Sequence, residues 1–234
     1  MTAKKKFNYP RPEYPRPILE RDQWLNLNGR WDFFAGTSDQ DPIRAIESEE
    51  NWIQEIVVPF APNSKLSGVV LATEPNFVAY RREFDLPAWD QKQVFLNIGA
   101  SDYITTVFLN GQNVGNHKGG YTPFSFRLTP YLKPKKNILI IVVEDSDSWQ
   151  QPRGKQAGTT RWPIDYDPIV GIWQTVWLEP KNNLYLSAIR NHFSLDSGSI
   201  FFTYQFSKPN DAEISTVLRL GGKEITREYC VCDN

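Results

Sequence analysis

The chain has 234 residues and an almost balanced charge, with 26 Lys and Arg residues against 27 Asp and Glu residues. This balance argues against the broad basic surface that is typical of nucleic-acid binding. Its 40% hydrophobic and 23% charged residues indicate a globular protein. The longest purely apolar run, residues 138–143, is far shorter than the roughly 20 residues of a membrane-spanning helix. We therefore expect neither nucleic acid nor a membrane among its partners.

Cysteine and histidine are too scarce for a disulfide framework or a metal site. The cysteines are Cys230 and Cys232, and the histidines are His117 and His192. Free thiols are typical of a reducing compartment, and a structural zinc site needs more ligands than these residues offer. Residues 4–6 are lysines, but a polar, proline-rich segment follows them instead of the apolar part of an export signal. The sequence predicts a cytoplasmic protein with no metal and no other cofactor.

Four prolines dominate the beginning of the chain: Pro10, Pro12, Pro15 and Pro17. Proline fixes its own backbone and disfavours helix in the residue before it. We expect residues 1–22 to form an extended arm along the surface of the following domain.

Beyond the arm, the hydrophobic pattern predicts strands. Apolar residues alternate with polar ones over residues 78–86, 94–98, 200–206 and 214–220, which places one set of side chains on each face of a strand. Residues 103–109 and 138–143 are apolar on both faces, as central strands are. Asn110-Gly111 predicts a tight hairpin between residues 103–109 and 112–117, because both residues tolerate positive φ. Residues 38–51 suit one helical turn or a loop, and no longer helix is indicated.

The sum is an all-β, antiparallel chain, and chains of this kind fold as sandwiches, jelly rolls or barrels. The strand predicted at residues 172–178 closes a first domain of residues 23–181, in which Trp24, Trp31, Trp173 and Trp177 are expected in the core. Only 53 residues follow, from 182 to 234. An immunoglobulin-like sandwich uses about 100. We expect this second domain to be truncated, so that either the chain is a fragment or these strands pair with something else.

A scan for catalytic motifs finds no phosphate loop, no Gly-x-Ser-x-Gly and no His-Glu-x-x-His. The densest polar cluster is a long loop between two apolar strands, over residues 150–156 and 161–167. Carboxylates and amides accept and donate hydrogen bonds to hydroxyl groups, and an aromatic ring covers the apolar face of a sugar. The alternative is a solvated or interdomain loop held by salt bridges.

Seven sequence blocks together resemble glycoside hydrolase family 2, the group of β-galactosidases, β-glucuronidases and β-mannosidases. They occur in the family's order over residues 9–181. The blocks are LNLNGRWDF at 25–33, VPFAPNS at 58–64, YRREF at 80–84, NGQNVG at 110–115, GGYTPF at 119–124, PRGKQ at 152–156 and GIWQTVWLE at 171–179.

The resemblance implies a jelly-roll, galactose-binding-like sandwich followed by the first strands of an immunoglobulin-like domain. In the family, a (β/α)₈ barrel comes third and carries both catalytic Glu residues, one of them in an Asn-Glu pair. No Asn in this chain is followed by Glu. We therefore expect no catalytic residue in this chain.

One site residue carries over from the resemblance. In the family, an Asp six residues before the glycine of the last block reaches the barrel's active site and binds sugar hydroxyls. That position is Asp165, and Asp167 lies two residues beyond it. With Asp165 we expect a substrate-binding set in the same loop: Arg153, Lys155, Gln156, Arg161 and Trp162.

The sequence thus predicts the non-catalytic N-terminal portion of a family 2 β-glycosidase, which supplies a scaffold and one substrate contact. Its expected partners are a β-linked carbohydrate and either the missing barrel or a second copy of the chain. Two other functions stay open, namely a stand-alone carbohydrate-binding module and a purely structural or oligomerisation domain.

Overall fold

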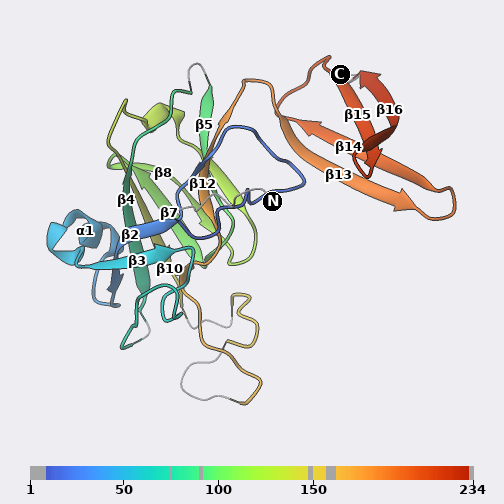
Figure 1. The fold of residues 1–234 in the computed structure, drawn as a ribbon. Coiled ribbons are helices and arrows are strands. Elements are labelled where there is room, and N and C mark those ends of the chain that lie inside the picture. The colour runs from blue at the N-terminus through green and yellow to red at the C-terminus, as the bar shows by residue number, and fades with distance from the viewer. Residues whose placement is uncertain (1–8, 74, 90–91, 147–149, 157–161, 232–234) are drawn as a thin grey trace, which may run out of the picture. The chain divides into compact units, whose positions relative to one another are not determined.

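The computed structural model describes residues 9–73, 75–89, 92–146, 150–156 and 162–231. The chain divides into two compact units, with the division between Pro180 and Lys181. Among the described residues, the sheets are antiparallel and the longest helix has six residues, which confirms the all-β sandwich prediction (Figure 1).

The first unit is built on two main sheets. In spatial order, the larger sheet comprises β3 (Gln54–Val58), β2 (Gly29–Gly36), β4 (Phe77–Phe84), β10 (Asn137–Glu144), β7 (Ile104–Leu109) and β8 (Gln112–Lys118). The smaller comprises, again in spatial order, β1 (Leu25–Asn26), β12 (Val176–Lys181), β5 (Gln93–Ile98) and β9 (Phe124–Arg127). A short pair joins β6 (Ser101–Asp102) to β11 (Gly171–Ile172).

The centre of the larger sheet is β10, as its apolar sequence predicts. Ile141 lies between Tyr80 of β4 and Val107 of β7, and all three are fully buried. Burying a large apolar side chain contributes about 1.5–3 kcal/mol to folding. The prediction that both faces of this strand are buried fails at its first apolar residue, because Ile138 is 41% exposed.

Turn chemistry sets the hairpin between β7 and β8. Asn110 and Gly111 both have positive φ, at 53° and 81°, and Leu109 pairs with Gln112. These are the backbone angles that a type I′ turn demands of its central residues. The predicted Asn-Gly hairpin is confirmed.

Helical structure in the described residues is limited to three short segments. They are α1 (Pro42–Glu47), the 3₁₀ turn η1 (Glu49–Asn51) and the 3₁₀ turn η2 (Thr129–Tyr131). The Asp41 side chain caps α1 by accepting from the backbone N–H of Ile43 and Arg44. The helical turn expected within residues 38–51 is confirmed. In the described part of the chain, no helix is long and apolar enough to cross a membrane.

The prediction of one continuous strand over residues 172–178 is wrong. The structure splits it into β11 and β12, which belong to different sheets. At the break, the backbone N–H groups of Trp173 and Gln174 both donate to the carbonyl of Ala100, so the ladder is interrupted and the chain changes sheets. Gly171 precedes the break with φ of +98°, and a Cβ there would lie 2.1 Å from the Tyr80 hydroxyl.

The break also changes the expected tryptophan core. Trp31 and Trp177 are buried at 1% and 2% exposure. Trp24 and Trp173 are only half-buried, because Trp24 precedes the first strand and Trp173 lies in the gap between β11 and β12. The prediction is therefore correct for two of the four tryptophans.

The second unit consists of two hairpins. One is β13 (Leu186–Ser194) with β14 (Ser199–Phe206), and the other is β15 (Glu213–Leu220) with β16 (Lys223–Val231). The side chains of Tyr204 and Thr216 share a hydrogen bond that links the hairpins. No residue of these four strands is buried, and large apolar side chains such as Phe193 and Phe201 are more than half exposed.

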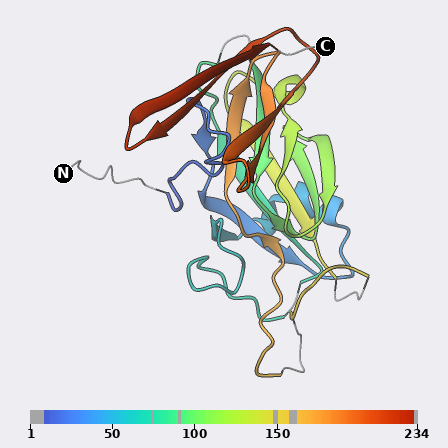
Figure 2. The same cartoon turned by 90° about the vertical axis from the view of Figure 1, so that its right-hand side faces the viewer.

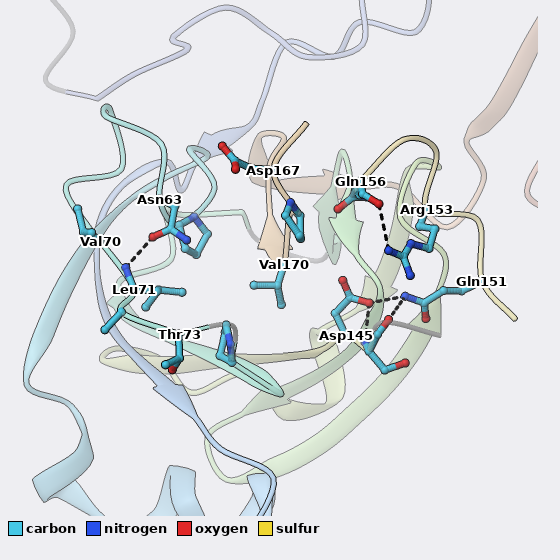
Figure 3. A pocket seen from close by; sticks show the side chains of 15 residues that line it. Asn63, Val70, Leu71, Thr73, Asp145, Gln151, Arg153, Gln156, Asp167 and Val170 are labelled. Carbon is cyan, nitrogen blue, oxygen red and sulfur yellow. Dashed lines mark hydrogen bonds between the residues drawn. The ribbon is translucent and has the colours of Figure 1, made fainter. Parts of the chain in front are cut away.

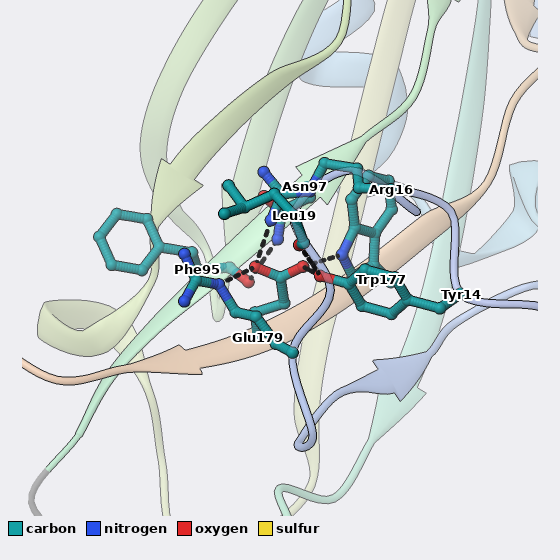
Figure 4. A network of polar contacts seen from close by, with 8 residues as sticks. Tyr14, Arg16, Leu19, Phe95, Asn97, Trp177 and Glu179 are labelled. Carbon is teal, nitrogen blue, oxygen red and sulfur yellow. Dashed lines mark hydrogen bonds and ion pairs between the residues drawn. The ribbon is translucent and has the colours of Figure 1, made fainter. Parts of the chain in front are cut away.

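The proline-rich arm has neither helix nor strand in its described part, residues 9–22, as expected. It is attached to the sandwich through Glu179 of β12, whose side chain is fully buried (Figure 4). The Glu179 carboxylate accepts hydrogen bonds from Tyr14 Oη at 2.5 Å, Arg16 Nη2 at 2.5 Å and Arg21 Nε at 3.2 Å. Trp177 Nε1 donates a further bond at 2.7 Å.

The electrostatics of this network favour the ionised carboxylate. Burial by itself would raise the pKa of Glu179, but the hydrogen bonds from Trp177 and Tyr14 and the charge of Arg16 outweigh it and hold the pKa below its usual value. Burial and the neighbouring Glu179 raise the pKa of Tyr14 to about 12, so its hydroxyl remains a donor. The arm is thus attached by donors converging on one buried charge.

Replacing Glu179 tests this attachment. Glu179→Gln removes the charge, and we expect it to lower the free energy of unfolding by about 1.5–3 kcal/mol at pH 7, the range for hydrogen bonds to charged groups. Because folding lowers the pKa of Glu179, its contribution is present above the unfolded value and is lost as the pH falls through the folded value. The difference between variant and wild type should therefore shrink in acid.

Denaturant unfolding over a pH series measures this effect, with Glu13→Gln as the control. Glu13 is an acid of the same arm, but its side chain is 60% exposed. Equal stability of the Glu179→Gln and Glu13→Gln variants at pH 7 would contradict the account.

Candidate functional site

A cavity of about 430 Å³ opens at one end of the sandwich, among loops. One wall is the segment between β3 and β4, and the other is the long loop between β10 and β11, whose described parts extend from the same end in both views (Figure 1, Figure 2). We refer to it as the loop cavity. Its polar lining includes Asn63, Asp145, Gln151, Arg153, Gln156 and Asp167 (Figure 3).

The first wall is held in shape by Asn63. This residue has a φ of 66°, in the left-handed region that Asn tolerates better than most residues. Its side-chain oxygen accepts a hydrogen bond of 2.6 Å from the backbone N–H of Leu71 (Figure 3), and its own N–H donates to the carbonyl of Val69. Asn63 therefore closes the loop on itself.

The second wall begins where β10 ends. Asp145 follows the strand, and its Oδ1 accepts hydrogen bonds from the backbone N–H of Ser146 and from Gln151 Nε2. The Gln151 amide also donates to the carbonyl of Ser146, at 2.6 Å. Farther along the loop, Arg153 Nη2 donates to the carbonyl of Gln156 at 3.0 Å. These contacts fold the loop back over the end of the sheet (Figure 3).

Gln156 joins the long loop to the sandwich. It is 9% exposed, its Nε2 donates to Asp102 Oδ2 at 3.3 Å, and its Oε1 accepts from the backbone N–H of Ile169 at 2.6 Å. It also forms a β-bridge with Tyr166. One side chain thus connects the middle of the loop, its end and the pair of short strands β6 and β11.

Asp102 is the buried partner of Gln156 and is 4% exposed. It packs so closely on Gly120 that a Cβ at that position would lie 2.3 Å from Asp102 Oδ1. Burial raises the pKa of Asp102 to about 6, the nearby carboxylate of Asp145 adds to the increase, and the hydrogen bond from Gln156 opposes it. Buried carboxyl groups with a raised pKa are common at functional sites and also occur in structural networks.

The structure brings together only part of the predicted substrate-binding set. Arg153 and Gln156 line the loop cavity. Lys155 is exposed, and its backbone N–H donates to the Tyr166 hydroxyl. Trp162 is 73% exposed. Arg161 lies outside the described residues.

Asp165 and Asp167 occupy different environments. Asp165 is half-buried, its Oδ2 accepts a 2.7 Å hydrogen bond from the backbone N–H of Trp162, and its own N–H donates to the Trp162 carbonyl. Asp165 therefore caps a turn of the loop. Asp167 is exposed and lines the loop cavity.

Three residues of this region, Asn63, Asp145 and Asp102, were not among the predicted site residues. Asn63 stands in the VPFAPNS block, and Asp145 comes directly after the apolar run of β10, so both positions carried a signal. The sequence signal for Asp102 is weaker, because only the three-dimensional contacts that bury its carboxylate set it apart from other acidic residues.

The chemistry of the loop cavity suits a polyhydroxylated ligand. Its walls offer carboxylate acceptors, amide groups that donate and accept, and the donors of one arginine. Within the described residues, no group of three or more His, Cys, Asp and Glu side chains is arranged to hold a metal ion.

Residues 25–181 match the family model described as "Glycosyl hydrolases family 2, sugar binding domain". The chain belongs to glycosyl hydrolase family 2. The resemblance seen in the sequence blocks is thereby confirmed, and the jelly-roll prediction is consistent with the two antiparallel sheets.

Curated family 2 relatives show how much of a family member this chain represents. A β-glucuronidase from Felis catus is 32% identical, over 90% of this chain and 36% of its own length. A β-galactosidase from Thermoanaerobacter pseudethanolicus is 25% identical, over 86% of this chain and 25% of its own length. The chain therefore spans well under half of either relative.

Solved family 2 structures share the fold. The β-glucuronidase of an uncultured Clostridium species superposes with a TM-score of 0.73 and 19% identity, over 92% of this chain and 40% of that protein. The β-glucuronidase of Bifidobacterium dentium gives a TM-score of 0.71 at 20% identity, over 92% of this chain and 41% of that protein.

We expect the stability of this family 2 domain to depend on pH through the buried carboxyl of Asp102. Because its folded pKa is raised above the usual value of 3.8, the stability from neutral Asp102 is present below about pH 4 and is lost as the pH rises through about 6. Asp102→Asn keeps the shape and stays neutral. We expect wild type to lose about 2–3 kcal/mol relative to this variant between about pH 4 and pH 7.5.

Thermal or denaturant unfolding across that range is the measurement. Asp167→Asn, the same substitution at an exposed residue of the loop cavity, is the control and should follow wild type. Parallel stability curves for wild type and Asp102→Asn would show that folding does not raise the pKa of Asp102.

Proposed function

We propose that this chain is the sugar-contacting, non-catalytic portion of a family 2 β-glycosidase and that the loop cavity forms one wall of the substrate site. The observation that carries the proposal is the position of this polar cavity inside the matched sugar-binding domain. The curated relatives include a β-galactosidase and a β-glucuronidase, so the proposed substrate class is a β-linked glycoside.

The reaction of the complete enzyme would be retaining hydrolysis. In such a reaction one carboxylate attacks the anomeric carbon, a second carboxyl group protonates the leaving oxygen, and water then releases the sugar from the enzyme. We assign both groups to a catalytic barrel, because no Asn-Glu pair occurs in the 234 residues. The role left to this chain is to hold sugar hydroxyls at the edge of the site.

Within the long loop, we propose Asp165 as the residue that recognises the sugar, and Asp167 is the alternative candidate. The turn made by Asp165 uses one carboxylate oxygen, Oδ2, for the Trp162 N–H. Asp167 lines the loop cavity. Arg153, Lys155, Gln156, Arg161 and Trp162 are proposed as supporting contacts, with Gln156 acting through the shape of the loop because both ends of its amide are engaged.

We further propose that residues 182–234 are part of an immunoglobulin-like domain, whose exposed apolar side chains are covered by a partner surface. The four strands without a buried residue support this, since a sheet face of this kind is stable only when it packs against another layer. Either further strands or a second copy of the chain would provide the layer. The cytoplasmic location stays a prediction.

The chain by itself should have no glycosidase activity. We expect no turnover of chromogenic β-galactoside, β-glucuronide or β-mannoside substrates by the purified 234-residue protein, because it lacks the proposed catalytic pair. Activity that persists after removal of host enzymes, and that disappears when an acid of this chain is mutated, would overturn the proposal.

Two substitutions at Asp165 separate recognition from folding in the complete enzyme. Asp165→Asn keeps an oxygen for the Trp162 N–H but removes the charge, so the turn should remain while kcat/KM falls. Losing a charged hydrogen bond costs about 1.5–3 kcal/mol, which is roughly a 10–150-fold loss. Asp165→Ala should lose the turn as well and melt earlier.

Asp167→Asn is the matched comparison in both kinetics and melting temperature. A larger kinetic loss for Asp167→Asn would assign recognition to Asp167 instead. If Asp165→Ala melts earlier while Asp165→Asn keeps full activity, Asp165 is only a turn residue.

A further inference from the structure

A second hollow, of about 750 Å³, lies between the proline-rich arm and the sandwich. We refer to it as the arm hollow. It shares no lining residue with the loop cavity. Its volume lies within the range of small-molecule binding sites.

Two aromatic side chains on the sandwich side of the arm hollow are oriented by contacts with their neighbours. Trp173 Nε1 donates a 2.8 Å hydrogen bond to the carbonyl of Gly120. The ring of Tyr121 stands against the Trp173 ring at 6.2 Å between centroids and an interplanar angle of 70°. Tyr121 is nevertheless 51% exposed. A ring that is oriented by its neighbours and open to solvent is a preformed surface for the apolar face of a sugar.

The opposite wall of the arm hollow is constrained by two prolines and an ion pair. Pro15 and Pro17 of the arm line it, with Arg16 between them. Arg16 is bound to the buried Glu179 at 2.5 Å, and proline has a fixed φ. Little ordering is therefore needed when a ligand enters, and a preformed site loses less affinity to ordering.

The charges in the arm hollow are already paired. Arg11 lies 3.5 Å from Glu13, and Arg16 binds Glu179, which also accepts from Arg21. The exposed side chain of Gln174 adds an uncharged amide that can donate and accept. This combination of an aromatic surface, an amide and compensated charges favours a neutral ligand with many hydroxyl groups.

We infer that the arm hollow is a second carbohydrate site, which binds a neutral oligosaccharide across Tyr121 and Trp173, separate from the loop cavity. The site would give this chain a binding function of its own, whether or not a catalytic domain is attached. It also gives the arm a role, because the arm supplies one wall. We expect a neutral oligosaccharide to bind more tightly than an acidic one, because each cation that lines the hollow already has an acidic partner.

Titration of the 234-residue chain tests the inference. The neutral probes are β-1,4-linked galactohexaose and cellohexaose, the acidic probe is hexagalacturonate, and calorimetry or NMR reads binding up to about 10 mM, well above the roughly 1 mM Kd of a weak site. We expect at least one neutral probe to bind and to bind more tightly than hexagalacturonate. Tyr121→Ala should weaken binding by about tenfold or more.

Further variants keep the result interpretable if Tyr121→Ala disturbs the fold. Tyr121→Phe retains the ring and should keep most of the affinity. Gln174→Ala, at an exposed side chain, should weaken binding severalfold, whereas Gln112→Ala, at an exposed residue of β8, should change nothing. Asp167→Asn in the loop cavity should leave oligosaccharide binding intact.

Three results would overturn the inference. They are the absence of binding by either neutral probe, preferential binding of hexagalacturonate, and binding of a neutral probe that both Tyr121→Ala and Gln174→Ala leave unchanged. None of these results affects the predicted inactivity of the chain or the predicted kinetics of the Asp165 variants. The proposal for the arm hollow can therefore fail while the proposed function stands, and the reverse.

Discussion

The polar end of this sandwich depends on the buried amide of Gln156. In its described residues, the loop that runs from β10 in the larger sheet to β11 has one isolated β-bridge, between Gln156 and Tyr166. Its other backbone groups need partners from elsewhere. Gln156 provides them by reaching Asp102 on the sandwich and the backbone of Ile169 near the end of the loop. The loop cavity, with Asp145, Arg153 and Asp167 around it, exists because this connection holds the loop over the end of the sheet.

Two buried carboxylates serve opposite electrostatic purposes in the same unit. Glu179 is surrounded by donors from Tyr14, Arg16, Arg21 and Trp177, so burial is outweighed and the charged form is favoured. Asp102 receives a single side-chain hydrogen bond among those described and lies near another acid, so burial dominates and its pKa rises. The first arrangement is an attachment point for the arm. In the second arrangement, burial raises the pKa of the carboxyl group that binds Gln156 to about 6.

The strands were predictable because their signals are local. Alternation within residues 94–98 and the Asn110-Gly111 turn depend on backbone geometry that neighbouring residues determine, and both appear in the structure. The break between β11 and β12 was not predictable in this way. It depends on Trp173 and Gln174 both bonding to Ala100, a residue more than 70 positions earlier.

The sequence predicted which segment contains the candidate site, but it did not predict which side chains of that segment line the cavity. Its composition placed it in residues 150–167, but the contacts that decide which side chains face the cavity are long-range, as with Gln156 and Asp102. Trp173 illustrates the same limit. Its sequence context is that of a core strand, whereas its half-buried position in the arm hollow follows from the bond to Gly120 and from the arm packed opposite.

The central claim is that the loop cavity is a sugar-contacting wall. Backbone amide shifts of the isotope-labelled chain, recorded by NMR during titration with methyl β-galactoside and methyl β-glucuronide, test it most directly. The account predicts that the largest shifts for at least one glycoside fall on residues of the cavity, such as Asn63, Gln151, Arg153 and Asp167. Saturating additions of both glycosides that leave these amides unmoved would contradict it.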